Sequence, residues 1–192
     1  MVEVAGKKKL RISTAWLSGC SGCHMSMLNM DEKIIEIADR LEFVRSPLVD
    51  RKNFEPCDVG LVEGAVSDDD NVAVVSELRA SCRELVAMGD CAVFGGMTSL
   101  RNLYDKEDIL RCAFDGKVAD DKDIDEHVPK LTENALGVDA YVRVDHYIPG
   151  CPPSPDSILQ VLSCLLKGEP VVLPKELIHY DSRIRRRSDE ND

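Results

Sequence analysis

Cysteine is the residue type in this sequence that is best suited to metal chemistry, and eight cysteines occur among 192 residues. Cys20 and Cys23 are separated by Ser-Gly, a spacing that lets two thiolates converge on one ion or cluster. Alone, this pair fits half of a zinc site, half of an iron–sulfur site or a thioredoxin-like redox pair. The redox pair is disfavoured because no Trp-Cys-Gly-Pro type pattern is present.

Two further cysteines follow strand-like apolar runs at glycine- or proline-containing bends. Cys91 lies in the glycine-flanked segment Gly89–Gly96, and Cys151 lies in Ile148–Pro153. The carboxyl ends of neighbouring parallel strands converge on one edge of an open sheet, where ligands bind. We therefore expect Cys91 and Cys151 to meet Cys20 and Cys23 there, although the segments are far apart in the sequence.

Four thiolates fit either zinc or a [4Fe–4S] cluster. Zinc sites more often use two close pairs, whereas Cys91 and Cys151 are single residues after separate strands. Pro152 follows Cys151, a feature shared with known cluster-binding runs. A cluster is therefore favoured, and a zinc-stabilised α/β binding module is the alternative. The other cysteines are interpreted as small buried hydrophobic residues: Cys57 at the start of a strand, Cys82 and Cys164 on helix-like segments, and Cys112 in an acidic region.

The elements that must position these cysteines alternate along the chain. Apolar runs predict strands at about 10–16, 41–45, 58–62, 85–89 and 140–147. Helical spacing and capping residues predict a helix over 26–40, a second after the N-cap candidates at 68–71, and a third that Pro155 opens and Gly168 ends. This alternation predicts an α/β fold, a flavodoxin-like open and mostly parallel sheet with helices on both faces.

The sequence predicts one domain with two charged additions. Residues 1–182 form the cluster-binding α/β domain, and residues from about 101 to 129 form an acidic insertion within it, either solvated with a short helix or a docking surface. Residues 183–192 carry charges of both signs, which predicts a flexible tail rather than a buried segment.

Net charge and hydrophobicity exclude several classes of protein. The chain has 24 Lys and Arg against 35 Asp and Glu, a net charge of −11, so a nucleic-acid or anionic-lipid partner is not expected. No apolar run approaches the roughly 18–20 residues that span a bilayer, and the start shows no apolar signal core. These features predict a soluble cytoplasmic protein whose cysteines stay reduced.

Four ordered motifs resemble the small subunit of [NiFe] hydrogenases. They are Trp16–Cys23, Val62–Val66, Gly89–Gly96 and Pro149–Pro153. The chain shows neither a twin-Arg signal nor a further C-terminal cluster domain, so it resembles most the small subunit of the soluble NAD(P)-reducing hydrogenase. The 20 kDa subunit of respiratory NADH:quinone oxidoreductase is the nearest competitor. Its first motif has two adjacent cysteines, whereas two residues separate Cys20 from Cys23.

The resemblance implies an electron relay in a multi-subunit hydrogenase. One [4Fe–4S] cluster would be held by Cys20, Cys23, Cys91 and Cys151. A large partner subunit would carry the Ni–Fe centre, and diaphorase subunits with FMN and iron–sulfur clusters would reduce NAD. We expect no FMN on this chain, because the cysteines occupy the first strand–helix turn.

Two accessory residues accompany the cysteines. Glu63 stands at the exit of the third strand beside Gly64; the resemblance favours a proton-handling carboxylate near the large subunit, and a surface or N-cap carboxylate is the alternative. His24 directly follows a ligand cysteine and is interpreted as positioning that loop.

Overall fold

The computed structural model describes residues 9–114 and 128–178. Within them, a five-stranded parallel sheet has the order β2-β1-β3-β5-β7. Its strands are β2 (Leu41–Arg45), β1 (Leu10–Trp16), β3 (Cys57–Glu63), β5 (Cys82–Met88) and β7 (His146–Ile148). Numbered within this sheet alone, the order is 2-1-3-4-5, which is that of flavodoxin-like folds. The predicted fold class is therefore confirmed.

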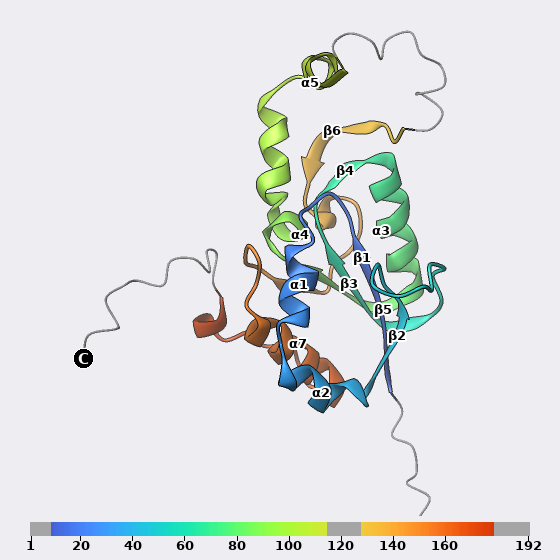
Figure 1. The fold of residues 1–192 in the computed structure, drawn as a ribbon, viewed down its shortest axis with the longest axis vertical. Helices are drawn as coiled ribbons and strands as arrows, with labels where there is room; N and C mark the ends of the chain where they lie inside the picture. The colour runs from blue at the N-terminus through green and yellow to red at the C-terminus, as the bar shows by residue number, and fades with distance from the viewer. Residues whose placement is uncertain (1–8, 115–127, 179–192) are drawn as a thin grey trace, which may run out of the picture.

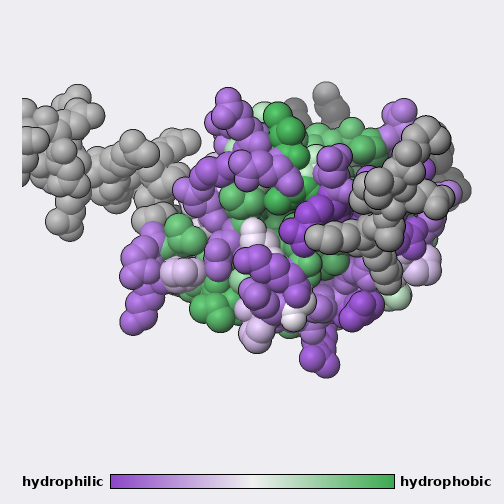
Figure 2. Space-filling view, turned by 90° about the horizontal axis from the view of Figure 1, so that it is seen from below, coloured by the Kyte–Doolittle hydropathy of each residue, from purple (hydrophilic) through white to green (hydrophobic). Residues whose placement is uncertain are grey.

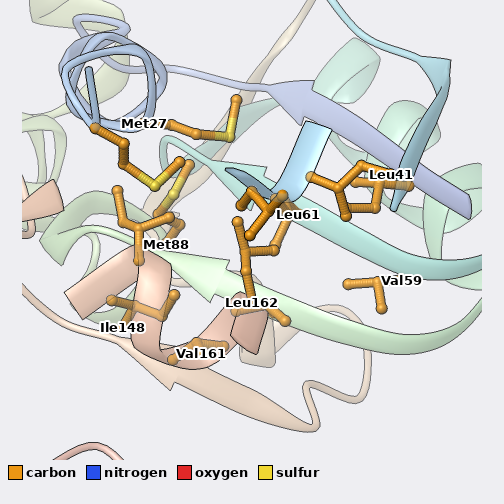
Figure 3. Close-up of a cluster of buried hydrophobic side chains, with 13 residues drawn as sticks. Met27, Leu41, Val59, Leu61, Met88, Ile148, Val161 and Leu162 are labelled. Atoms are coloured by element: carbon orange, nitrogen blue, oxygen red, sulfur yellow. The ribbon is translucent and has the colours of Figure 1, made fainter. Parts of the chain in front are cut away.

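Helices cover both faces of the sheet (Figure 1). One face packs against α1 (Gly22–Leu28), α2 (Glu32–Ala38) and α7 (Pro155–Lys167), and the other packs against α3 (Asp69–Ser81). Side chains alternate between the faces, so Leu61 joins the first core and Val62 joins the second. Figure 3 shows the first core, in which Met27 of α1 and Leu162 of α7 pack with strand residues Leu61 and Met88.

The predicted helix-start signals operate as expected. The Asp68 carboxylate accepts a hydrogen bond of 2.8 Å from the Asn71 backbone N–H at the start of α3. Ser154 caps α7 in the same way, with Pro155 in its first turn, and Gly168 ends that helix at a φ of 68°. These signals fix where each helix meets the sheet.

A smaller antiparallel sheet of β4 (Val66–Asp68) and β6 (Leu131–Leu136) was not predicted from the sequence. It packs near α4 (Asp90–Phe94) and the 3₁₀ helix η1 (Gly96–Leu103). Arg101 ties η1 to both strands, because its guanidinium donates to the Ser67 and Thr132 carbonyl oxygens at 3.0 and 2.9 Å. The start of the expected acidic insertion is therefore attached to the domain.

The short helix expected in the insertion is present as α5 (Lys106–Phe114). Within the described residues, the other helical segments are the short 3₁₀ turns η3 (Val138–Ala140) and η4 (Lys175–Leu177). None of the helices in the described part of the chain is long and apolar enough to cross a bilayer. The predicted tail at 183–192 lies outside the described residues, and the 1–182 domain boundary stays a prediction.

Two predicted elements are wrong in extent. The helix expected over 26–40 is interrupted between α1 and α2, where Asp31 has a φ of 50°. Met27 and Met30 both pack in the core, so the helical spacing of apolar residues continues across this turn. The hydrophobic pattern therefore does not show that the helix is interrupted. The strand expected over 140–147 shrinks to β7, because the backbone bonds to β5 only from Asp145 onward.

Candidate iron–sulfur site

The predicted ligand cysteines all lie in loops or first helical turns beyond the carboxyl ends of the strands. Cys20 follows β1 and Cys23 is the second residue of α1. Cys91 is the second residue of α4, which follows β5, and Cys151 follows β7. Because β1, β3, β5 and β7 are parallel neighbours, these segments lie along one edge of the sheet.

Electrostatic interactions link Cys23 to Cys20 and Cys91. The pKa of Cys23 lies far above its usual value. Burial is the largest cause; the charge and hydrogen bonding of Glu63 raise the pKa further, and the nearby Cys91 and Cys20 add smaller increases. Cys20 and Cys91 therefore lie within electrostatic reach of Cys23. A thiolate at Cys23 needs nearby positive charge for stabilisation, which iron or another metal ion supplies.

Glycines make room for the sulfur atoms. A Cβ at Gly89 would lie 2.2 Å from the Cys23 Sγ, and one at Gly96 would lie 2.9 Å from the Cys91 Sγ. A Cβ at Gly22 would lie 3.2 Å from the Cys20 Sγ and 3.9 Å from the Pro152 Cβ. The last contact places the loop of Cys151 next to the Cys20–Cys23 turn. The absence of side chains at these glycines therefore leaves room for the sulfur atoms where the cysteine-bearing segments come together.

Hydrogen bonds fasten the Cys151 loop to the other two. The Gly150 N–H donates to the Asp90 carboxylate at 2.7 Å, and the Asp90 N–H donates to the Gly150 carbonyl at 2.9 Å. The Ser26 hydroxyl donates to the Pro153 carbonyl at 2.6 Å, and the Cys151–Pro152 peptide is cis. Asp90 and Ser26 were missed in the sequence, although each stands within three residues of a ligand cysteine.

Glu63 lies beneath the site at the end of β3, with only 2% of its surface exposed. One carboxylate oxygen accepts the Cys23 backbone N–H at 2.9 Å, and the other accepts the Nδ1–H of buried His24. Burial alone would raise the pKa of Glu63, but the hydrogen bonds and charge from His24 and Cys23 outweigh it and lower the pKa. Glu63 is therefore an ionised buried acceptor and not the surface or N-cap carboxylate of the alternative interpretation.

Cysteine sulfur is a ligand for both a zinc ion and an iron–sulfur cluster. Within the described ranges, no three His, Cys, Asp or Glu side chains are grouped closely enough to hold one metal ion. A zinc ion would need four ligand atoms about 2.0–2.3 Å away, which forces the sulfurs close together. A [4Fe–4S] cluster binds four cysteine thiolates on four separate irons, so the sulfurs stand further apart.

The other four cysteines do not directly follow the carboxyl end of a strand of the main sheet. Cys57, Cys82 and Cys164 are buried, as expected, although Cys82 begins β5 and does not lie on a helix. Cys112 is exposed on α5, so its prediction as a buried hydrophobic residue is wrong. Residues 106–113 of α5 are exposed or half-buried, so this helix offers no buried position for a small side chain.

The carboxyl edge of the sheet is open and flanked by apolar side chains. Cys20 and Cys151 are exposed, whereas Cys23 and Cys91 are half-buried. Near them in sequence, Trp16 ends β1, Met25 lies on α1 and Phe94 lies on α4, and each exposes half or more of its surface. Exposed aromatic and methionine side chains of this kind are enriched in protein interfaces.

Comparison with known proteins identifies relatives that share most of this chain. Residues 20–165 match the family described as NADH ubiquinone oxidoreductase, 20 Kd subunit. The NAD-reducing hydrogenase HoxS subunit delta of Cupriavidus necator is 35% identical over 180 residues, covering 90% of this chain and 86% of that protein. A crystal structure of NAD⁺-reducing [NiFe]-hydrogenase in the H₂-reduced state includes a chain that is 37% identical, with a TM-score of 0.84, over 91% of this chain and all of that one.

Other relatives are longer than this chain. A subunit of the F420-non-reducing hydrogenase of Methanococcus voltae is 35% identical over 174 residues, and the match covers 88% of this chain but 61% of that protein. A [NiFeSe]-hydrogenase structure from Dm. baculatum shares the fold with a TM-score of 0.58 at 19% identity. The core found here is therefore common to hydrogenase subunits of different lengths.

Proposed function

The chain belongs to the family of the 20 kDa subunit of NADH ubiquinone oxidoreductase, and we propose that it is the electron-transfer small subunit of an NAD-reducing [NiFe] hydrogenase. The observation that carries the proposal is the convergence of four thiol-bearing segments at the carboxyl edge of the sheet, around glycines that leave room for sulfur. The similarity to two NAD-reducing hydrogenases over nearly the whole chain supports the choice of complex.

Cys20, Cys23, Cys91 and Cys151 are the proposed ligands of one [4Fe–4S] cluster. When bound, such a cluster supplies one-electron transfer at a potential that net charge, hydrogen bonds and solvent exposure adjust. The chain contributes the four thiolates, the space beside Gly89 and Gly96, and a buried floor formed by Glu63. The proton-handling role of Glu63 stays a prediction. Both of its carboxylate oxygens accept hydrogen bonds within the chain.

The open edge supports a complex with other proteins. Two of the proposed ligands are exposed, and a cluster held there needs a partner surface to restrict water. The proposed partners are a large subunit with the Ni–Fe centre, where hydrogen is split, and diaphorase subunits with FMN and iron–sulfur clusters, where NAD is reduced. A cytoplasmic location is part of the proposal, because cysteines that serve as cluster ligands must stay reduced.

Purification under anaerobic conditions with a tag on this chain tests the proposal. We expect a nickel-containing large subunit and a flavin-containing diaphorase to copurify, and hydrogen to reduce NAD in the presence of this complex. Copurification with quinone-reductase subunits and no nickel would instead support the 20 kDa respiratory subunit. One zinc per chain without acid-labile sulfide would support the binding module and overturn the proposal.

A further inference from the structure

A buried chain of polar side chains runs from the proposed ligand Cys23 across three neighbouring strands. Glu63 at the end of β3 accepts the Cys23 backbone N–H, and it accepts the Nδ1–H of His24. The other ring nitrogen of His24, Nε2, lies 2.9 Å from the Thr14 hydroxyl on β1. Thr14 in turn donates to the Ser46 hydroxyl, just beyond β2, at 2.9 Å.

All four side chains of this chain are sealed from solvent. Thr14 is completely buried, and His24, Ser46 and Glu63 expose 1–2% of their surfaces. A buried carboxylate is strongly unfavourable unless hydrogen bonds satisfy its oxygens. Among the described residues, Glu63 meets this condition through two adjacent residues of α1: Cys23, with its backbone N–H and its thiol, and the side chain of His24.

The two hydrogen bonds to Glu63 constrain the first turn of α1, which carries the proposed ligand Cys23. Cys23 and His24 are consecutive, so a single carboxylate fixes both the backbone of the ligand and the side chain that follows it. The Thr14 hydroxyl limits rotation of the imidazole from the opposite side. The first turn of α1 is thereby attached to β1 and β3, and the direction of the Cys23 N–H is set by Glu63.

We propose that His24 is a positioning residue that holds the Glu63 carboxylate against the Cys23 backbone N–H and so fixes the orientation and surroundings of that cluster ligand. The inference rests on the proposed function, since it concerns the properties of a cluster bound to Cys23. Hydrogen bonds and charges close to a ligand thiolate affect cluster potential and electronic structure. His24 acts on the cluster through Glu63 and Cys23 and is not itself a ligand.

Two amide substitutions separate this role from simple packing. In His24→Asn the side-chain amide nitrogen occupies about the position of Nδ1 and can still donate to Glu63, whereas in His24→Gln it occupies about the position of Nε2 and reaches toward Thr14. Glutamine fills the buried space better than asparagine. Positioning therefore predicts that His24→Asn is the milder change, and packing predicts the opposite order.

The variants are compared in the anaerobically purified complex, at one pH, by iron content, by the EPR spectrum of the reduced clusters and by redox titration. We expect His24→Asn to stay closer to the wild-type spectrum and midpoint potential than His24→Gln does. His24→Gln should change the spectrum of one cluster and shift its midpoint potential, or lose its iron, while the signals of the other clusters in the complex stay constant. Identical behaviour of both variants, or greater damage from His24→Asn, overturns the proposal.

A second pair of variants covers the case in which neither His24 variant assembles. Thr14→Val keeps the shape of the side chain and removes the hydroxyl behind Nε2, whereas Thr14→Ser keeps the hydroxyl. We expect Thr14→Val to change the same EPR signal, and Thr14→Ser to leave it as in the wild type; equal spectra for the two contradict the positioning role. Absence of any [4Fe–4S] signal from this chain in the wild-type complex would instead refute the proposed function.

Discussion

The two edges of the main sheet both carry cysteines, yet in opposite surroundings. At the amino edge, Cys57 and Cys82 are paired in register at the starts of β3 and β5, and each exposes less than a tenth of its surface. At the carboxyl edge, Cys20 and Cys151 are exposed in loops. The same side chain is thus a packing residue at one edge and a proposed ligand at the other.

Backbone and charge explain the difference. At the amino edge, burial raises the pKa of Cys82 to about 11, which keeps it a neutral thiol, and its sulfur fills the space beside Gly60. Seen from below, where the strands begin, the surface is a mixture of hydrophilic and hydrophobic residues (Figure 2). At the carboxyl edge, Gly89 and Gly96 have positive φ angles that L-residues rarely adopt, and they bring the backbone close to the sulfurs. Position relative to the strand, and not residue type, decides which cysteines are available for metal.

The largest expected effect comes from removing a proposed ligand. Cys151→Ser should abolish or strongly reduce assembly of this cluster, because serine lacks the soft thiolate that iron prefers. Cys164→Ala, in the buried face of α7, should leave the cluster intact. Iron and sulfide analysis of the anaerobically purified complexes checks both. Equal losses from the two variants would show that the ligand assignment is wrong.

The substitution Gly89→Ala tests whether the cluster needs the space that Gly89 leaves beside the Cys23 sulfur. Its new Cβ would lie 2.2 Å from the Cys23 Sγ, so cluster content should fall several-fold. Gly168→Ala is the matched control, because Gly168 also has a positive φ but nothing lies within 4 Å of a Cβ there. That control should lose about 1 kcal/mol of stability from backbone strain and keep its cluster. Full cluster content in Gly89→Ala would contradict the packing described here.

At the amino edge, the Arg79–Asp145 pair should affect folding and not the cluster. Asp145 accepts the Leu85 N–H at 2.9 Å and a guanidinium N–H of Arg79 at 2.6 Å. Burial would raise the pKa of Asp145, but the hydrogen bonds from Leu85 and Arg79 outweigh it and lower the pKa. We expect Asp145→Asn to cost about 2 kcal/mol at pH 7, measured by urea-induced unfolding.

The pH dependence of this loss has a defined sign. Because the folded-state pKa is lowered, the stabilisation by Asp145 is present above the ordinary value of about 3.9 and disappears as pH falls through the folded-state pKa. Wild type and Asp145→Asn should therefore converge in stability below about pH 4. Asp108→Asn, in an exposed pair with Arg111, should cost less than about 0.5 kcal/mol. A constant gap at all pH values would contradict an ionised Asp145 as its source.

The smallest effect is expected for a buried cysteine at the amino edge. Cys82→Ala removes one sulfur from the core and should cost about 1 kcal/mol with the cluster retained, as measured by unfolding and iron content. Cys112→Ala, at an exposed position, should change stability by less than about 0.5 kcal/mol. Loss of iron in Cys82→Ala would show that the two edges are not functionally separate.

The sheet order and the cysteine edge were predictable because strand exits in parallel sheets converge, and Cys20, Cys91 and Cys151 each stand next to a strand exit. The pairing of His24 with Glu63 was not, since it joins residues 39 positions apart and depends on how α1 sits on the sheet. The small β4–β6 sheet was missed for a similar reason, because β6 is short, has a single buried residue and pairs across more than 60 residues. Local sequence patterns predict helices and strands. The buried side chains beneath the site, such as His24 and Glu63, are brought together by contacts between distant residues, which a local pattern does not show.

Anomalous diffraction from crystals of the anaerobically purified complex, recorded at the iron and zinc absorption edges, tests the central claim most directly. We predict four iron positions at the carboxyl edge of the sheet, bonded to Cys20, Cys23, Cys91 and Cys151. A single zinc position there, or iron bound by a different set of side chains of this chain, would contradict it.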